Sequence, residues 1–145
     1  MTAIDDLYQA GTSTWLDDLS RERIATGNLV EVKDAKSIVG VTTNPAIFAA
    51  AMGSGTHYDE QLAELKQAGT TADAAVYAMS VKDVQDACDL FRDTYEATGG
   101  KDGRVSIEVD PRFAADEQKT IDQARELWQL VDRDNLMIKI PATDE

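Results

Sequence analysis

The sequence predicts an α/β fold built on a parallel β-sheet, and three observations support this prediction. Short apolar, β-branched segments alternate with longer amphipathic segments along the 145 residues. The segments between the short runs are long enough to contain helices, as connections between parallel strands must be. The composition, 43% hydrophobic and 28% charged, can fill a core and is not that of a disordered chain.

Two strands and three helices are predicted in the first 52 residues. Residues 12–17 are rich in β-forming side chains, and residues 38–43 form an apolar, β-branched run. Short helices over residues 19–25 and 29–36 lie between these strands. Asn44 followed by Pro45 is typical of an N-cap and a first helical residue, so a third helix is expected up to about residue 52.

The next fifty residues are predicted to be helical. A helix that ends at Gly69 is followed by a short one over residues 72–79. Ser80, with Asp83 three residues later, predicts the start of a separate helix that reaches the glycines at 99–100.

Two more strands and a helix complete the chain. Residues 104–109 alternate polar and apolar side chains, and Pro111 ends this strand. An amphipathic helix is expected over residues 115–131. A strand over residues 136–140 follows, and it is ended by Pro141.

The charge of the chain excludes several classes of partner. Fourteen basic residues against 27 acidic ones leave a net charge of −13. Nucleic acids and anionic membranes bind basic surfaces, so we expect neither as a partner. The chain has no apolar run near the ~20 residues that cross a bilayer, and no signal peptide is expected at the N-terminus. With a single cysteine, these features predict a cytoplasmic protein.

A polar residue stands at the end of each predicted strand. These residues are Asp17, Asn44, Glu108 and Lys139, and Thr42 shares the parity of Asn44. Residues of one parity share a face of a strand, so one face carries polar groups while the other is apolar. Such a sheet resembles the inside of a (β/α)8 (TIM) barrel, whose active sites lie at the carboxyl ends of the strands. We therefore expect a barrel-type fold, of which this chain supplies about the first four strands.

Lys139 is the strongest single candidate for catalysis. It lies within an apolar strand, where burial would disfavour the charged form and leave a neutral amine. A neutral amine attacks carbonyl groups and forms a Schiff base, which withdraws electrons from an adjacent carbon–carbon bond. The alternative is an edge-strand lysine that limits aggregation or extends its amine into water.

Glu108 and Asp17 are candidates for moving protons around such a lysine. Alternatively, Asp17 or its neighbour Asp18 caps the following helix, and Glu108 forms a structural ion pair with Arg104 or Lys139. Asn44 can be an N-cap, a substrate ligand or both. No metal site is expected, because His57, the only histidine, is interpreted as a loop residue without metal-ligand partners at the usual spacing.

Four segments together resemble the transaldolase family in its actinobacterial form. They follow the family's order along nearly the whole chain. The segments are Trp-Leu-Asp-Asp-Leu-Ser-Arg at 15–21, Gly-Val-Thr-Thr-Asn-Pro-Ala-Ile-Phe at 40–48, Val-Ser-Ile-Glu-Val-Asp-Pro-Arg at 105–112 and Asn-Leu-Met-Ile-Lys-Ile-Pro-Ala-Thr at 135–143.

The resemblance implies a function and a role for each candidate residue. Lys139 would be the Schiff-base lysine, Asp17 the acid/base at the first strand, and Glu108 an acid that acts through a bound water. Asn44 and Thr42 would contact substrate and water. The family transfers a dihydroxyacetone unit from sedoheptulose 7-phosphate to glyceraldehyde 3-phosphate in the non-oxidative pentose phosphate pathway, with no cofactor or metal.

The chain departs from the family in length, because a (β/α)8 barrel takes ~250 residues. The resemblance implies that an asparagine, a serine and a phosphate-binding arginine lie on later strands. We therefore expect residues 1–145 to be the N-terminal portion of a single barrel without a second domain. Its partners would be sugar phosphates and the C-terminal half of the barrel, with that half either in the same polypeptide or in a separate piece. The chain alone would be inactive. The alternatives are a Schiff-base aldolase of sugar phosphates that does not transfer, and a non-catalytic α/β module.

Overall fold

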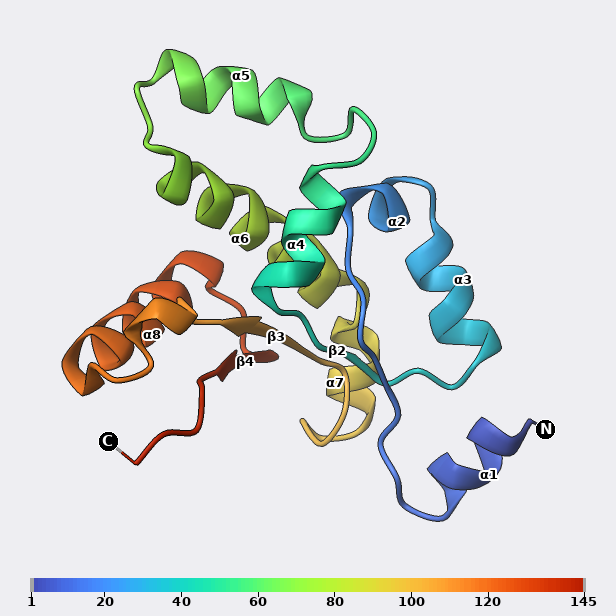
Figure 1. The fold of residues 1–145 in the computed structure, drawn as a ribbon. Coiled ribbons are helices and arrows are strands. Elements are labelled where there is room, and N and C mark those ends of the chain that lie inside the picture. The colour runs from blue at the N-terminus through green and yellow to red at the C-terminus, as the bar shows by residue number, and fades with distance from the viewer. Residues whose placement is uncertain (1, 145) are drawn as a thin grey trace.

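A four-stranded parallel sheet forms the centre of the computed structural model, which describes residues 2–144 (Figure 1). The strands are β1 (Trp15–Leu16), β2 (Gly40–Val41), β3 (Arg104–Glu108) and β4 (Leu136–Lys139). They lie in the order β1-β2-β3-β4, and each neighbouring pair is parallel. The predicted α/β class and parallel sheet are confirmed.

Helices make every connection between the strands. α2 and α3 join β1 to β2, α4 to α7 join β2 to β3, and η1 and α8 join β3 to β4. Figure 1 shows α6 and α8 beside the sheet and α5 farther out, against α6. The helices are α1 (Ala3–Gln9), α2 (Arg21–Ala25), α3 (Asn28–Ala35), α4 (Pro45–Met52), α5 (Asp59–Gln67), α6 (Ala72–Leu90), α7 (Arg92–Ala97), the 3-10 helix η1 (Pro111–Phe113) and α8 (Glu117–Val131).

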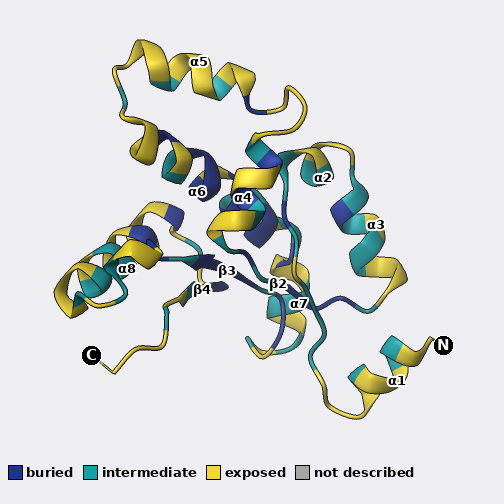
Figure 2. Ribbon diagram, in the orientation of Figure 1, coloured by how far each residue is buried: buried dark blue, intermediate teal, exposed yellow. Residues whose placement is uncertain are grey.

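One face of the sheet carries the hydrophobic core. On β3 and just after it, Val105, Ile107 and Val109 are buried, and they pack with apolar side chains of α6 and α8. Figure 2 shows this buried layer between the strands and the helices. The alternation predicted for residues 104–109 is therefore confirmed, because the apolar parity faces the helices. The polar side chains that alternate with them, Ser106 and Glu108, lie on the opposite face.

The first two strands are shorter than predicted. The ladder between them contains only Trp15 with Gly40 and Leu16 with Val41, although strands were expected over 12–17 and 38–43. Single backbone hydrogen bonds continue the pairing on both sides, from Val39 to Thr14 and from Thr42 to Leu16. The flanking residues Thr14 and Thr43 also bond through their side chains, to the carbonyls of Ser37 and Ser106.

The prediction of two helices on either side of residue 80 is wrong. α6 runs unbroken from Ala72 to Leu90, and Ser80 lies inside it. The Ser80 hydroxyl donates to the Val76 carbonyl one turn earlier, so it does not cap a helix. Asp83 is fully buried and binds groups outside α6.

α1 was not expected from the sequence. Thr2 and Asp5 form a capping box at its start, which is a signal for a helix. None of the residues of α1 is buried, so the helix adds nothing to the core that the sequence analysis traced.

Polar side chains link the amino ends of the strands, and we call this group the amino-end cluster. The Ser13 hydroxyl donates to Asp102, which is buried just before β3. The Thr14 hydroxyl donates to the Ser37 carbonyl ahead of β2. Asn135, directly before β4, donates to two backbone carbonyls. Together these bonds fix the four lead-in segments relative to one another.

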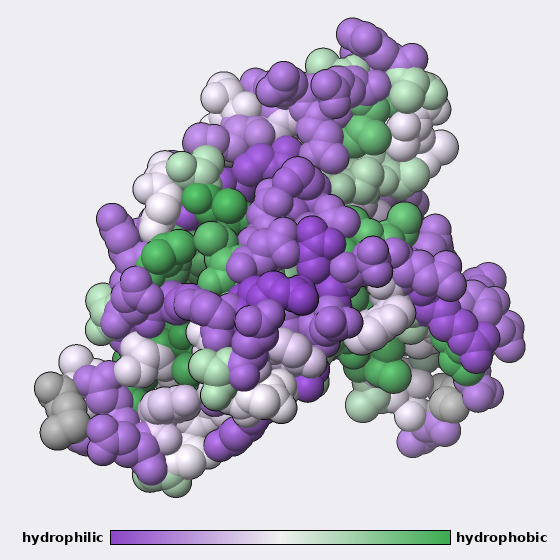
Figure 3. All heavy atoms as spheres, turned by 180° about the vertical axis from the view of Figure 1, so that it is seen from behind, coloured by the Kyte–Doolittle hydropathy of each residue, from purple (hydrophilic) through white to green (hydrophobic). Residues whose placement is uncertain are grey.

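The face of the molecule opposite to that in Figure 1 is largely hydrophilic. Seen from behind, purple hydrophilic residues cover most of the face, and the green hydrophobic areas between them are separate (Figure 3). Within residues 2–144, none of the helices has both the length and the apolar content needed to span a bilayer.

Gly40 is required by a close approach between two strands. A Cβ atom at residue 40 would lie 2.5 Å from the indole ring of Trp15. We therefore expect Gly40→Ala to lower the free energy of unfolding by about 1–3 kcal/mol through overpacking. Urea denaturation of both proteins measures this loss. In a Trp15→Ala background the same change should cost much less, and equal losses in the two backgrounds would contradict the steric explanation.

Candidate active site

The register of β3 and β4 brings two of the predicted site residues together. Glu108 is paired with Lys139 in the ladder, on the face opposite the core. Lys139 Nζ lies 3.0 Å from Glu108 Oε2, and it also donates to the Thr43 carbonyl at 3.3 Å. An amine and a carboxylate in direct contact can exchange a proton. The ends of β2, β3 and β4 therefore meet at the lysine.

The expected burial of Lys139 is not found. Its side chain is 43% exposed, whereas that of Glu108 is 14% exposed. The neighbouring Met137 on the same face is also exposed, so within residues 2–144 this face of β4 is open to solvent. In the described chain, the ion pair with Glu108 fixes the amine, and burial does not.

Thr42 is oriented by a serine that sequence reasoning did not include among the site residues. The Ser106 hydroxyl donates to Thr42 Oγ1 at 3.2 Å and accepts from the Thr43 amide at 3.2 Å. Ser106 is buried on β3, two residues before Glu108. Their shared parity was the signal that could have identified it.

Asn44 caps α4 and keeps a donor for other partners. Its Oδ1 accepts from the Ile47 amide at 3.0 Å, as the sequence predicted for an N-cap. Its Nδ2 forms no hydrogen bond with any other described residue. Both alternatives for Asn44 can therefore hold, because the cap uses only the oxygen.

Asp17 follows β1 directly, and the structure does not bring it into contact with Lys139. Its side chain is exposed and forms no hydrogen bond or ion pair within the described residues. The bond from the Thr42 amide to the Leu16 carbonyl places Asp17 next to the end of β2.

The alternative that Asp17 or Asp18 caps the following helix is wrong. Ser20 is the N-cap of α2, and its hydroxyl accepts from the Arg23 amide. Asp18 instead forms an ion pair with Arg23 at 2.7 Å. The suggested pair between Glu108 and Arg104 is also absent, because the Arg104 guanidinium donates to the Gly100 carbonyl.

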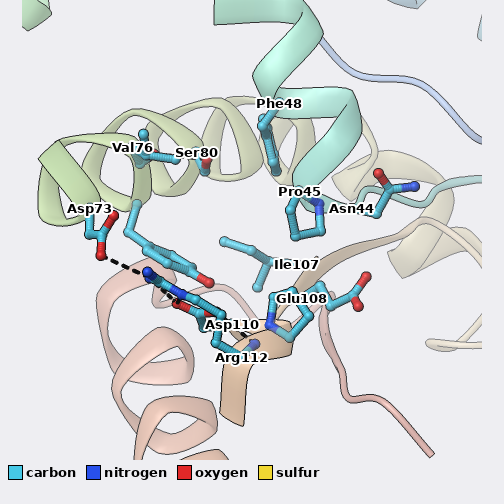
Figure 4. Close-up of a pocket in the computed structure, with 12 residues that line it drawn as sticks. Asn44, Pro45, Phe48, Asp73, Val76, Ser80, Ile107, Glu108, Asp110 and Arg112 are labelled. Atoms are coloured by element: carbon cyan, nitrogen blue, oxygen red, sulfur yellow. Dashed lines mark hydrogen bonds and ion pairs between the residues drawn. The ribbon is translucent and has the colours of Figure 1, made fainter. Parts of the chain in front are cut away.

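A cavity of about 260 Å³ lies beside this site, between α4, α6 and η1 (Figure 4). Asn44 and Glu108 stand at its edge, and its wall is mostly apolar, including Phe48. Arg112 bridges it by ion pairs to Asp73 and Asp110. The Arg112 guanidinium holds the pKa of the Asp110 carboxyl below its usual range.

Within the described part of the chain, no three His, Cys, Asp or Glu side chains are grouped so that they could hold a metal ion. The arrangement at the strand ends is an amine, a carboxylate, a hydroxyl and an amide, which suits carbonyl chemistry.

Comparison with known proteins identifies the family. The family model for Transaldolase/Fructose-6-phosphate aldolase matches residues 14–145. The chain belongs to this family. The assignment that the four sequence segments indicated is thereby confirmed.

Characterised transaldolases of actinobacteria are similar to nearly the whole chain. The transaldolase of Mycolicibacterium smegmatis is 59% identical over 137 residues, which is 94% of this chain. Transaldolase 1 of Streptomyces avermitilis is 59% identical over 140 residues, and transaldolase 1 of Streptomyces coelicolor is 58% identical over 141 residues, each covering 97% of this chain. The matched region is 37% of the length of each relative.

Proposed function

We propose that this protein acts in a transaldolase that works through a Schiff base on Lys139. The donor is sedoheptulose 7-phosphate and the acceptor is glyceraldehyde 3-phosphate, which yields erythrose 4-phosphate and fructose 6-phosphate in the cytoplasmic pentose phosphate pathway. The observation that carries the proposal is the 3.0 Å contact between Lys139 and Glu108 at the strand ends of a transaldolase-family chain.

Glu108 prepares the lysine for attack. Its carboxylate takes a proton from the Lys139 ammonium, and the free amine adds to the ketose carbonyl to form a carbinolamine. Protonation of the carbinolamine hydroxyl releases water and leaves the iminium ion. As the family resemblance implies, Glu108 acts on this hydroxyl through a bound water.

Asp17 serves the carbon–carbon step. It takes the proton from the hydroxyl beside the bond that breaks, the aldehyde leaves, and the electron pair moves into the iminium to give an enamine on Lys139. Addition of the enamine to the acceptor aldehyde, followed by hydrolysis, completes the transfer. Asn44 Nδ2 and the Thr42 hydroxyl hold substrate hydroxyls and water.

We infer that the rest of the barrel lies outside residues 1–145. The chain spans only 37% of the length of its relatives, and β1 and β4 have unpaired edges within the described residues. A C-terminal portion of the same barrel would pair with these edges and supply the phosphate-binding arginine. That division accounts for the net charge of −13, which by itself disfavours a phosphorylated substrate. Neither nucleic acid nor membrane is a proposed partner.

The experiments use two forms of the protein. One is the 145-residue chain. The other, which we call the completed protein, joins it to the remaining C-terminal portion of the transaldolase of Mycolicibacterium smegmatis. The completed protein should be active and the chain alone inactive.

A second candidate is a sugar-phosphate aldolase that cleaves without transfer. The family description names fructose-6-phosphate aldolase beside transaldolase, and both reactions use the same lysine chemistry. Turnover that requires an acceptor aldehyde identifies a transaldolase, whereas release of free dihydroxyacetone without acceptor identifies an aldolase.

Lys139→Ala should abolish the covalent intermediate in the completed protein. The substitution removes the nucleophile and little packing, because the side chain is partly exposed. Incubation with fructose 6-phosphate and borohydride, followed by peptide mass spectrometry, should find a sugar-derived adduct on Lys139 in the unmodified protein alone. An adduct on another lysine would refute the assignment, and no adduct in an intact, folded protein would favour the non-catalytic alternative.

Glu108→Gln should slow imine formation by about 10²–10⁴-fold, the usual range for a general acid–base group. Substrate binding should change far less, because the amide retains the shape of the carboxylate. Single-turnover trapping measures the rate, and Glu117→Gln on the exposed start of α8 is the matched control. Unchanged adduct kinetics would limit Glu108 to a structural ion pair.

Asp17→Asn should leave imine formation intact and block carbon–carbon cleavage, because the base for the sugar hydroxyl is lost. The trapped intermediate should accumulate above the level in the unmodified protein. Asp18→Asn is the control, since Asp18 only pairs with Arg23 at a partly exposed position. If Asp18→Asn blocks the reaction and Asp17→Asn does not, the roles of the two residues are reversed.

A further inference from the structure

Three side chains form a buried polar cluster that the proposed chemistry does not use. Arg21 Nε lies 2.8 Å from Asp83 Oδ1, and the Tyr58 hydroxyl donates to Asp83 Oδ2 at 2.6 Å. The Arg21 amide in turn donates to the Tyr58 hydroxyl at 3.0 Å. The Asp83 side chain is 0% exposed and that of Arg21 is 18% exposed. We call these residues the Arg21 cluster.

The Arg21 cluster joins three separate segments of the chain. Arg21 is the first residue of α2, Tyr58 immediately precedes α5, and Asp83 lies in the middle of α6. The guanidinium also stacks over the Tyr58 ring, 4.5 Å from its centroid, and donates to the Met79 carbonyl. Two contacts therefore join Arg21 directly to α6, and three more connect it there through Tyr58.

Stability alone is a weak reason for such a cluster. Removing two opposite charges from water costs about as much as their attraction returns, and apolar residues of similar volume often stabilise a fold equally well. Burial raises the pKa of the Asp83 carboxyl, against the hydrogen bonds from Tyr58 and Arg21, which lower it. What an ion pair of this kind supplies is a fixed geometry.

The geometry that it fixes is that of the segment carrying Asp17. Only residues 17–20 separate the end of β1 at Leu16 from Arg21. Leu16 is held in the ladder with β2, and Arg21 is held by the cluster. Asp17 has no hydrogen bond of its own to a described residue, so its position depends on the contacts of the chain around it. Leu19 is buried in the core and Asp18 pairs with Arg23, while the Arg21 cluster holds the end of the segment.

We propose that the Arg21 cluster is a positioning device for Asp17. By anchoring the start of α2 to α6, it keeps residues 17–20 in one conformation and the Asp17 carboxylate at the carboxyl end of β1. Arg21, Tyr58 and Asp83 are thus positioning residues that touch no substrate. The inference rests on the proposed role of Asp17 in carbon–carbon cleavage.

Hydrogen exchange on the completed protein tests the anchoring without any use of activity. Asp83→Asn should speed exchange in peptides covering residues 17–20 by about tenfold, a change expected when local opening becomes easier. The double variant Arg21→Met with Asp83→Leu removes both charges and keeps the volume, so it should loosen the segment while the protein stays folded. Asp93→Asn, which breaks the Lys33–Asp93 pair between α3 and α7, is the matched control. Unchanged exchange in the double variant would overturn the proposal.

Trapping in the completed protein tests the catalytic consequence. The double variant should form the ketose imine at a near-normal rate but cleave it up to about 10²-fold more slowly, the cost of a small misplacement of a catalytic group. Tyr58→Phe removes the hydroxyl and with it the bonds to Asp83 and to the Arg21 amide. It should slow cleavage in the same way but by a smaller factor. Loss of binding, imine formation and cleavage in equal proportion would indicate a general structural defect and overturn the proposal, as would normal cleavage in a loosened segment.

The two proposals fail in different ways. If the unmodified completed protein forms no adduct on Lys139, the proposed function fails whatever the cluster does. If it forms the adduct and turns over, but the cluster variants behave like Asp93→Asn, the function stands and the positioning role fails.

Discussion

The four strands run in the same direction and in chain order, and this constraint places all of their carboxyl ends at one edge of the sheet. Because side chains alternate along a strand, a shared register also assigns each parity to one face. Val41, Val105 and Leu136 consequently form a buried layer on the helical side. Glu108 and Lys139 are paired on the other face by the same register. The hydrophobic core and the candidate site are two results of one pairing pattern.

The sequence predicted the parts of this arrangement in which several signals agree. In residues 104–109, alternation, β-branched side chains and a following proline indicate the same strand, and β3 was found there. Asn44 with Pro45 located the start of α4 because capping and the fixed proline torsion act together. At these positions local chemistry alone determines the conformation.

The misses occurred where distant contacts decide the outcome. Ser80 and Asp83 match a capping box, yet the carboxylate is used by Arg21 and Tyr58, which lie far away in sequence. Lys139 was expected to be buried because its neighbours in sequence are apolar. Of these, Leu136 and Ile138 pack in the core, whereas Met137 and Ile140 are exposed like the lysine. The hydrogen bond from Ser106 to Thr42 joins residues 64 positions apart, so the parity of Ser106 predicts its face of the strand but not this partner. The face on which a side chain lies could be predicted from parity. The exposure of that side chain depends on which element covers the face.

The amino-end cluster joins the strands at one end of the sheet, and the candidate site lies at the other. Ser13, Asp102 and Asn135 join the strands at the end remote from Lys139, and their hydrogen bonds are buried or nearly so. In barrel folds that end contributes to stability, while the loops at the opposite end carry the chemistry. Substitutions in the segments that follow β1, β2 and β3 therefore leave the amino-end cluster intact, although Thr43 after β2 also bonds to Ser106 on β3. Variants at the carboxyl ends of the strands can therefore be made while the amino-end cluster is kept unchanged, which makes these segments the natural place for library design.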